Sequence, residues 1–281
     1  MAIFTPFAFF GGISSPPVPP PPVDPDAQAF IDAVVLGGDT LTIPEKEAIN
    51  NLVLDLKTYG LYYKMVFFYP LIGGTASAHK WNLINPVNTD AGFRITFNGG
   101  WTHSASGARA DGVNAWGNTH FLPSVDVAAY SLTNDLGMGV YINLNTTGNY
   151  DLGAYQPSKG DWLVYVRNSS NLCLFDGFAG SAFISYTPVT DSSGHWINNK
   201  TTSTVVEGYK DGVRVVNQGS RTPMLPPNQT IAIAASNRIG AACCFSDRQY
   251  VTIHLGSALT TTEAADLYTT LTTYNTSLGR V

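Results

Sequence analysis

The sequence feature that most constrains the fold is an Asp-Gly pair set between two short runs of β-forming residues. Asp211-Gly212 follows VVEGYK and precedes VRVV. A two-residue Asp-Gly loop in this position favours a type I′ turn, because both central residues need a positive φ. The sequence therefore predicts a β-hairpin, with further strands over 230–235 and 249–255. A small isolated hairpin domain is the alternative, but three such strands need a second sheet to cover them.

Candidate strands recur at intervals of roughly ten residues through the middle of the chain. Turn clusters such as Asn98-Gly99-Gly100 and Lys159-Gly160-Asp161 separate them. Many short strands with regular turns are typical of a sandwich or jelly roll. The expected strands cover residues 92–98, 118–122, 138–143, 162–167, 172–175, 181–186 and 205–209.

Capping boxes mark two of the three helices that the sequence predicts. Thr42 and Glu45 form the first box, followed by apolar residues at helical spacing, and Gly60 is the expected stop. Thr260 and Glu263 form the second box, at the start of a C-terminal helix. A shorter helix is expected over 26–36. These helices are too few to close a core alone, so we expect them to pack on the β body or on another subunit.

The N-terminus combines an oily peptide with a stiff spacer. The peptide carries Phe4, Phe7, Phe9 and Phe10, and the segment ISSPPVPPPPVDP that follows favours extended polyproline II structure. Phenylalanines ahead of such a spacer do not fold back easily, and exposed apolar groups mark interaction sites. We expect these four residues to dock on a partner; a disordered tail or a first strand of the sandwich are the alternatives.

Composition and charge exclude several classes of function. Charged residues make up 12% of the chain and the formal net charge is −5, which argues against nucleic acid or an anionic membrane as a partner. No apolar run is long enough to span a bilayer, and a cleaved signal peptide is not expected. Cys173, Cys243 and Cys244 form neither a zinc pattern nor an expected disulfide, because vicinal cysteines rarely bridge each other; all three are expected to be buried thiols.

The C-terminal half resembles the laminin-G/concanavalin A-like jelly roll. The resemblance rests on the hairpin YKDGVRV, on the strand over 231–234, and on the closing segment FSDRQYVTIHLGSALTTTEAADLYTTLTTY. The segment over 43–86 also resembles the opening of structural proteins of tailed bacteriophages. These resemblances imply an all-β concanavalin A-like jelly-roll sandwich, with short N-terminal helices, a C-terminal helix and an extended N-terminal arm.

Catalytic chemistry is not expected. The resemblance implies that an enzyme of this fold would use two acidic residues on one strand, as glycoside hydrolysis requires. The glutamates are Glu45, Glu47, Glu207 and Glu263, and Glu207 has only Asp211 nearby, at the hairpin tip. The histidines lack metal-ligand spacing, and Asp151, Asp161 and Asp191 are scattered loop acids with no sign of a calcium site. We predict no catalytic residue, cofactor or metal.

Carbohydrate binding remains open, because aromatic residues and hydrogen-bonding groups gather in two Gly-rich stretches. Asn98, Trp101 and His103 lie in one stretch, and Trp116 lies in the other, close to Asn118 and His120. An exposed ring beside such groups is suited to a sugar. The alternative interpretation is that Trp101 and Trp116 pack in the core or at its rim.

The sequence thus predicts three parts: a docking peptide and spacer (1–24), a helical collar (25–61) and a jelly-roll body with a C-terminal helix (62–281). The expected function is a non-enzymatic structural protein of a bacteriophage virion, a capsid- or tail-attached fibre or decoration protein. It would dock on other virion proteins through its arm, as a homo-oligomer. The alternative is a lectin-like module that binds host glycans.

Overall fold

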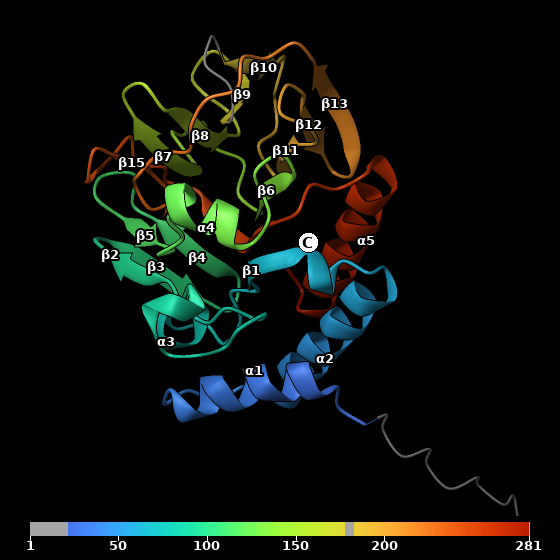
Figure 1. Cartoon of the computed structure of the whole chain (residues 1–281). Helices are drawn as coiled ribbons and strands as arrows, with labels where there is room; N and C mark the ends of the chain where they lie inside the picture. The colour runs from blue at the N-terminus through green and yellow to red at the C-terminus, as the bar shows by residue number, and fades with distance from the viewer. Residues whose placement is uncertain (1–21, 178–182, 281) are drawn as a thin grey trace, which may run out of the picture.

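The computed structural model describes residues 22–177 and 183–280, and shows two β-sheets packed into a sandwich, with the long helices lying outside it (Figure 1). Among the described strands, pairing is antiparallel except for one short parallel pair between β15 and β7. This architecture confirms the predicted two-sheet sandwich with N-terminal helices and a C-terminal helix. Within the described residues, no helix is both long enough and apolar enough to span a membrane.

The first sheet has eight strands in the described part of the chain, in the order β13-β12-β11-β6-β17-β4-β3, with β1 paired to β17. They are β1 (Met65–Tyr69), β3 (Trp101–Ser104), β4 (Gly107–Ala110), β6 (Leu136–Ile142), β11 (Gly194–Lys200), β12 (Val206–Lys210), β13 (Val213–Gln218) and β17 (Gln249–Gly256).

The second sheet has nine strands in the same residues, in the order β10-β9-β8-β7-β14-β5-β2, with β15 and β16 attached through β7. They are β2 (Thr96–Asn98), β5 (Trp116–Asn118), β7 (Leu152–Gln156), β8 (Gly160–Tyr165), β9 (Cys173–Gly177), β10 (Ile184–Tyr186), β14 (Ala232–Ile233), β15 (Ser236–Arg238) and β16 (Ala241–Cys243).

The hairpin predicted at Asp211-Gly212 is present as β12 and β13. Asp211 has a φ of 51° and Gly212 a φ of 75°, so both central residues adopt the left-handed conformation that this turn requires. Lys210 and Val213 pair across the turn. The local Asp-Gly signal therefore identified a real two-residue hairpin.

The three long helices share an apolar cluster with the outer face of the first sheet, whereas the short α4 (Pro123–Ala129) contributes Val127 to the core between the sheets. The long helices are α1 (Pro25–Leu36), α2 (Ile43–Thr58) and α5 (Thr261–Ser277), accompanied by α4, the short α3 (Ala76–His79) and 3-10 turns at Tyr62–Lys64 and Asp90–Gly92. Both predicted capping boxes are present. One hydrophobic cluster joins these helices to the outer face of the sheet, and a second fills the space between the sheets. Residues 25–61 therefore join the sandwich through one continuous apolar cluster, in which α1 packs on α2 and α2 packs on α5.

Strand β11 was not predicted, because its sequence GHWINNK is polar. Its polar side chains are nevertheless buried, and each makes a long-range hydrogen bond. The amide of Asn198 donates to the carbonyl of Leu163 (3.0 Å), that of Asn199 donates to the carbonyl of Leu259 (2.8 Å), and the ammonium of Lys200 donates to a backbone carbonyl (2.9 Å). Burial of these groups depends on partners that a local pattern does not reveal.

Candidate functional site

The residues predicted to dock on a partner, Phe4, Phe7, Phe9 and Phe10, lie outside the described residues. The described chain begins just before α1, whose N-cap is Asp24. Asp24 accepts a hydrogen bond from the amide of Asp26, and the ammonium of Lys57 lies 2.7 Å from its carboxylate. The start of α1 is therefore held by both a cap and an ion pair.

The predicted glycan-binding residues are divided between the two sheets. Asn98 on β2 pairs with Trp116 on β5. Their neighbours Phe97 and Gly117 face the core: Phe97 packs on the inner cluster, and a Cβ added to Gly117 would lie 3.3 Å from Ile233. Because side chains alternate along a strand, Asn98 and Trp116 lie together on the outer face of the second sheet.

Trp101 and His103 belong to β3 of the first sheet. The ring of Trp101 lies 5.2 Å from that of Phe97 and 6.4 Å from that of Tyr250, so it packs at the rim of the core. The Nδ1 atoms of His103 and the buried His79 are 2.9 Å apart. Of the four predicted residues, Asn98 and Trp116 lie together on an outer sheet face. Sugar binding by these residues stays a prediction.

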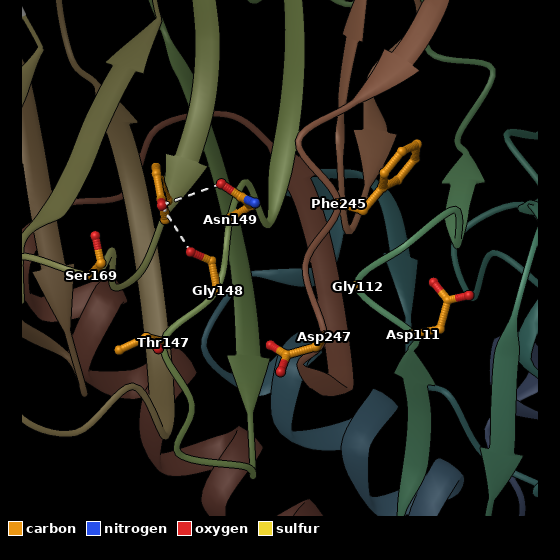
Figure 2. A pocket seen from close by; sticks show the side chains of 9 residues that line it. Asp111, Gly112, Thr147, Gly148, Asn149, Ser169, Phe245 and Asp247 are labelled. Carbon is orange, nitrogen blue, oxygen red and sulfur yellow. Dashed lines mark hydrogen bonds between the residues drawn. The ribbon is translucent and has the colours of Figure 1, made fainter.

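A polar cleft of about 450 Å³ opens where loops of the two sheets meet (Figure 2). Segments that follow β4, precede β7, end β8 and precede β17 contribute to its walls. The lining therefore combines carboxylates, hydroxyls, backbone groups and two aromatic rings. The residues are Asp111, Gly112, Thr147, Gly148, Asn149, Tyr165, Ser169, Phe245 and Asp247.

The loop over 146–149 is held in place by a buried arginine. Arg248 donates hydrogen bonds to the carbonyls of Thr146 (3.3 Å) and Asn149 (3.2 Å), and it forms an ion pair with Asp151 at 2.8 Å. Neither side chain of the pair is exposed. A Cβ on Gly148 would lie 2.9 Å from the guanidinium, so the loop lies directly against it. The cleft is thus preorganised from beneath.

Asp151 lies in a loop directly before β7, as expected, but its complete burial was not predicted. Its carboxylate accepts hydrogen bonds from the amide of Val166 (2.9 Å), the hydroxyl of Tyr250 (2.8 Å) and Arg248. A buried carboxylate is retained only with such partners. The partners come from other parts of the chain, so no local pattern indicated this role.

The two acids that line the cleft differ in their surroundings. One carboxylate oxygen of Asp111 accepts hydrogen bonds from three backbone amides, those of residues 113, 114 and 115. These amides hold the pKa of Asp111 below its usual value, so the group stays ionised at neutral pH. Asp247 accepts a hydrogen bond from the hydroxyl of Thr146 (3.2 Å). Figure 2 shows the two carboxylates on neighbouring loops, beside Gly112.

Glu207 lies away from the residues that line this cleft. It is 7% exposed, and its carboxylate accepts hydrogen bonds from Arg214 (2.8 Å) and from the hydroxyl of Tyr209 (2.6 Å). Within residues 22–177 and 183–280, no group of three His, Cys, Asp or Glu side chains is arranged to hold a metal ion. The cleft can therefore accept and donate hydrogen bonds, and its rings can pack on an apolar surface.

Sequence reasoning did not identify the cleft. Phe245 and Asp247 begin the closing segment of the jelly-roll resemblance, which implied no binding role for them, and Thr146, the hydrogen-bond partner of Asp247, lies 101 residues away in sequence. The three cysteines also need a correction. Cys173 is buried as expected, whereas Cys243 and Cys244 are only half-buried.

Comparisons with known proteins bear on the fold. No protein-family model matches the chain, and no curated protein sequence matches it. A solved structure of Trypanosoma rangeli sialidase in complex with 2,3-difluoro-KDN superposes with a TM-score of 0.51 at 12% identity, over 79% of this chain and 39% of the sialidase chain. The chain is a β-sandwich. At this identity the similarity is one of fold alone, and the chain spans about two-fifths of the sialidase it matches.

Weaker matches also come from solved proteins. Domain 4 of the extracellular arabinanase AbnA from Geobacillus stearothermophilus, in complex with arabinotriose, gives a TM-score of 0.47 at 11% identity, over 73% of this chain and 98% of that domain. The binding domain of Paraclostridial Mosquitocidal Protein 1 gives a TM-score of 0.44 at 13% identity, over 74% and 52%.

Proposed function

We propose that this β-sandwich is a non-catalytic glycan-binding module whose sugar site is the cleft lined by Asp111, Phe245 and Asp247. The observation that carries the proposal is the cleft itself, a preorganised polar hollow with aromatic rings at its wall. Sugar hydroxyls both donate and accept hydrogen bonds, and the C–H face of a pyranose is apolar. Concave sites that combine apolar surface with a few fixed polar groups are the usual small-ligand sites of proteins.

The groups in the cleft suit this ligand. The carboxylates of Asp111 and Asp247 are acceptors, and the hydroxyls of Thr147 and Ser169 can serve as either donor or acceptor. Phe245 and Tyr165 offer aromatic surface, and the Tyr165 hydroxyl is held by the carbonyl of Gly148 at 2.8 Å. Because Arg248 fixes the loop from beneath, little ordering is needed when a ligand binds.

Absence of catalysis is part of the proposal. A glycosidase needs one carboxyl group that is protonated near neutral pH to act as the general acid. Asp111 is held ionised by three amide groups. Glu207 is engaged by Arg214 and Tyr209 away from the cleft. These surroundings favour binding over hydrolysis.

We further propose that the module is carried on the virion of a tailed bacteriophage, assembled in the host cytoplasm as a homo-oligomer. The support is the resemblance of residues 43–86 to phage structural proteins and the composition of the N-terminal arm. Phe4, Phe7, Phe9 and Phe10 would dock on other virion proteins, while the cleft would face host glycans. Symmetric repetition of a weak sugar site would raise its avidity.

Glycan-array screening followed by calorimetry tests the sugar site. In Asp247→Ala and Phe245→Ala variants we expect a loss of affinity of at least tenfold, or about 1.4 kcal/mol each. Tyr130→Ala is the matched control, because Tyr130 is 46% exposed and belongs to a different hollow. If Trp116→Ala abolishes binding while Asp247→Ala does not, the site lies on the outer face of β2 and β5. Failure to bind any glycan would contradict the proposed function itself.

A further inference from the structure

Two adjacent cysteines lie next to the cleft with their sulfur atoms close together. Cys243 ends β16 and Cys244 follows it with a φ of 61°, and their Sγ atoms are 3.1 Å apart. Both residues are only half-buried. The remaining cysteine, Cys173, is fully buried in β9. Cys243 and Cys244 are therefore the accessible thiols of the described chain, and their sulfur atoms are close enough for an oxidant to join them.

The position of the pair links it to the cleft wall. The carbonyl of Cys244 accepts a hydrogen bond from the amide of Tyr150 (3.3 Å), just after the loop held by Arg248. Phe245 follows directly and lines the cleft. Ser246 is then fixed, because its amide donates to the carbonyl of Ala234 (2.8 Å) and its hydroxyl donates to Asp151 (3.3 Å). A backbone change at the cysteines would therefore move Phe245 and disturb the hydrogen bond from the Tyr150 amide.

We propose that Cys243 and Cys244 form a redox modification site that closes to a vicinal disulfide by exchange with a low-molecular-weight disulfide. One cysteine, as its thiolate, attacks a sulfur of that disulfide; the first small thiolate leaves and a mixed disulfide forms. The second cysteine loses its proton and attacks the protein sulfur of the mixed disulfide, and the second small thiolate leaves. The protein thus loses two hydrogen atoms, and the small disulfide is reduced to two thiols.

The bond should be easy to reverse. Adjacent Cα atoms across a trans peptide are about 3.8 Å apart, whereas ordinary disulfides join Cα atoms roughly 4.4–6.8 Å apart. A bond within this pair must distort the backbone, and strained disulfides are the readily reduced ones. Burial and the neighbouring thiol raise the pKa of Cys243 to about 11, so exchange should be faster at alkaline pH. The pair would be a disulfide in oxidising surroundings and two thiols in a reducing cytoplasm.

Oxidised glutathione is the probe for the test, applied to the full native chain. We expect the peptide containing both cysteines to lose two hydrogen atoms by mass spectrometry, to retain no glutathione, and to recover its mass with dithiothreitol. Hydrogen exchange at the Tyr150 amide should quicken in the oxidised form. Cys173→Ser is the matched control and should behave as wild type, while Cys243→Ser should stop at a glutathione adduct on Cys244.

Phenylarsine oxide gives a second measurement that does not require the strained bond, because trivalent arsenic bridges two neighbouring thiolates. The wild-type chain should take up one equivalent, and prior oxidation by glutathione disulfide should block this uptake. Retention of glutathione on the wild-type cysteines would overturn the proposal, and so would an unchanged peptide mass after treatment. Neither measurement depends on glycan binding.

Discussion

Arg248 and Asp151 form an ion pair between the two sheets, with Nη1 of the arginine 2.9 and 2.8 Å from the two carboxylate oxygens and no exposed surface on either side chain. Breaking a buried pair leaves one charge without compensation, which costs about 3–5 kcal/mol. We therefore expect Asp151→Asn to lower the free energy of unfolding by that amount in urea denaturation. It should also quicken hydrogen exchange in the loop over 146–149.

Asp90→Asn is the matched control for this prediction. Asp90 pairs with Arg94 at 3.0 Å, but its side chain is 61% exposed. An exposed pair contributes at most about 1 kcal/mol. If both substitutions lowered the free energy of unfolding equally, the Arg248–Asp151 pair would not be what holds the loop over 146–149.

Gly212→Val should destabilise the hairpin. Its φ of 75° disfavours a β-branched side chain, and an added Cβ would lie 2.8 Å from the Cα of Ala265 on α5. The strain alone costs about 1–3 kcal/mol. Gly60→Val is the control, because Gly60 has a φ of 71° with no atom within 4 Å of its Cβ position. A larger drop in melting temperature for Gly212→Val is expected; equal drops would mean that the turn does not press on α5.

Buried histidines should make the protein less stable in mild acid. His195 and His254 contact each other through Nε2 atoms 2.9 Å apart, and burial lowers the pKa of His254 from its usual 6.5 to about 3 and that of His195 well below 6.5. Their contribution to stability is complete above the unfolded-state pKa and is lost as pH falls from about 6.5 toward 3. Each histidine adds a slope of about 1.4 kcal/mol per pH unit in this window.

Urea denaturation at several pH values measures this slope. We expect a His195→Gln, His254→Gln double variant to have a slope smaller by up to about 2.7 kcal/mol per pH unit between about pH 6 and 4.5. Comparison with wild type cancels the contribution of carboxylates. An unchanged slope would mean that these histidines become protonated in the folded protein.

The N-terminal arm should be dispensable for folding but required for docking. Removal of residues 1–22 should leave the melting temperature unchanged and abolish incorporation into particles. Removal of 1–24, the boundary expected from the sequence, should also cost about 0.5–2 kcal/mol, because Asp24 caps α1 and pairs with Lys57.

Phe7→Ser with Phe9→Ser tests the docking side chains directly. The double variant should dock more weakly, with the melting temperature of the isolated chain unchanged, because burial of each ring contributes up to about 1.5–3 kcal/mol only at the partner. A melting temperature lowered by the substitutions would place the arm in the sandwich instead.

No hydrolysis is expected on β-glucans, galactans or peptidoglycan. Glu207 would be the natural suspect for any activity, but its two oxygens are engaged by Arg214 and Tyr209. Release of reducing sugar by the purified chain, lost in Glu207→Gln, would contradict this prediction.

The sequence by itself determined the features that depend on a few neighbouring residues. Asp211-Gly212 specified its turn because positive φ is a local requirement, and Thr42–Glu45 and Thr260–Glu263 specified helix starts because a capping box closes within one turn. The rhythm of short strands and turns then predicted the two-sheet sandwich.

Only the tertiary structure decided where the cleft lies and which polar groups are buried. Asp151 and Arg248 are 97 residues apart in sequence, and Thr146 and Asp247 are 101 apart. Asn198 and Asn199 of β11 can be buried because the carbonyls of Leu163 and Leu259 accept their hydrogen bonds. Such contacts follow from the order and register of strands across both sheets, and the residues involved carry no local pattern that reveals their partners.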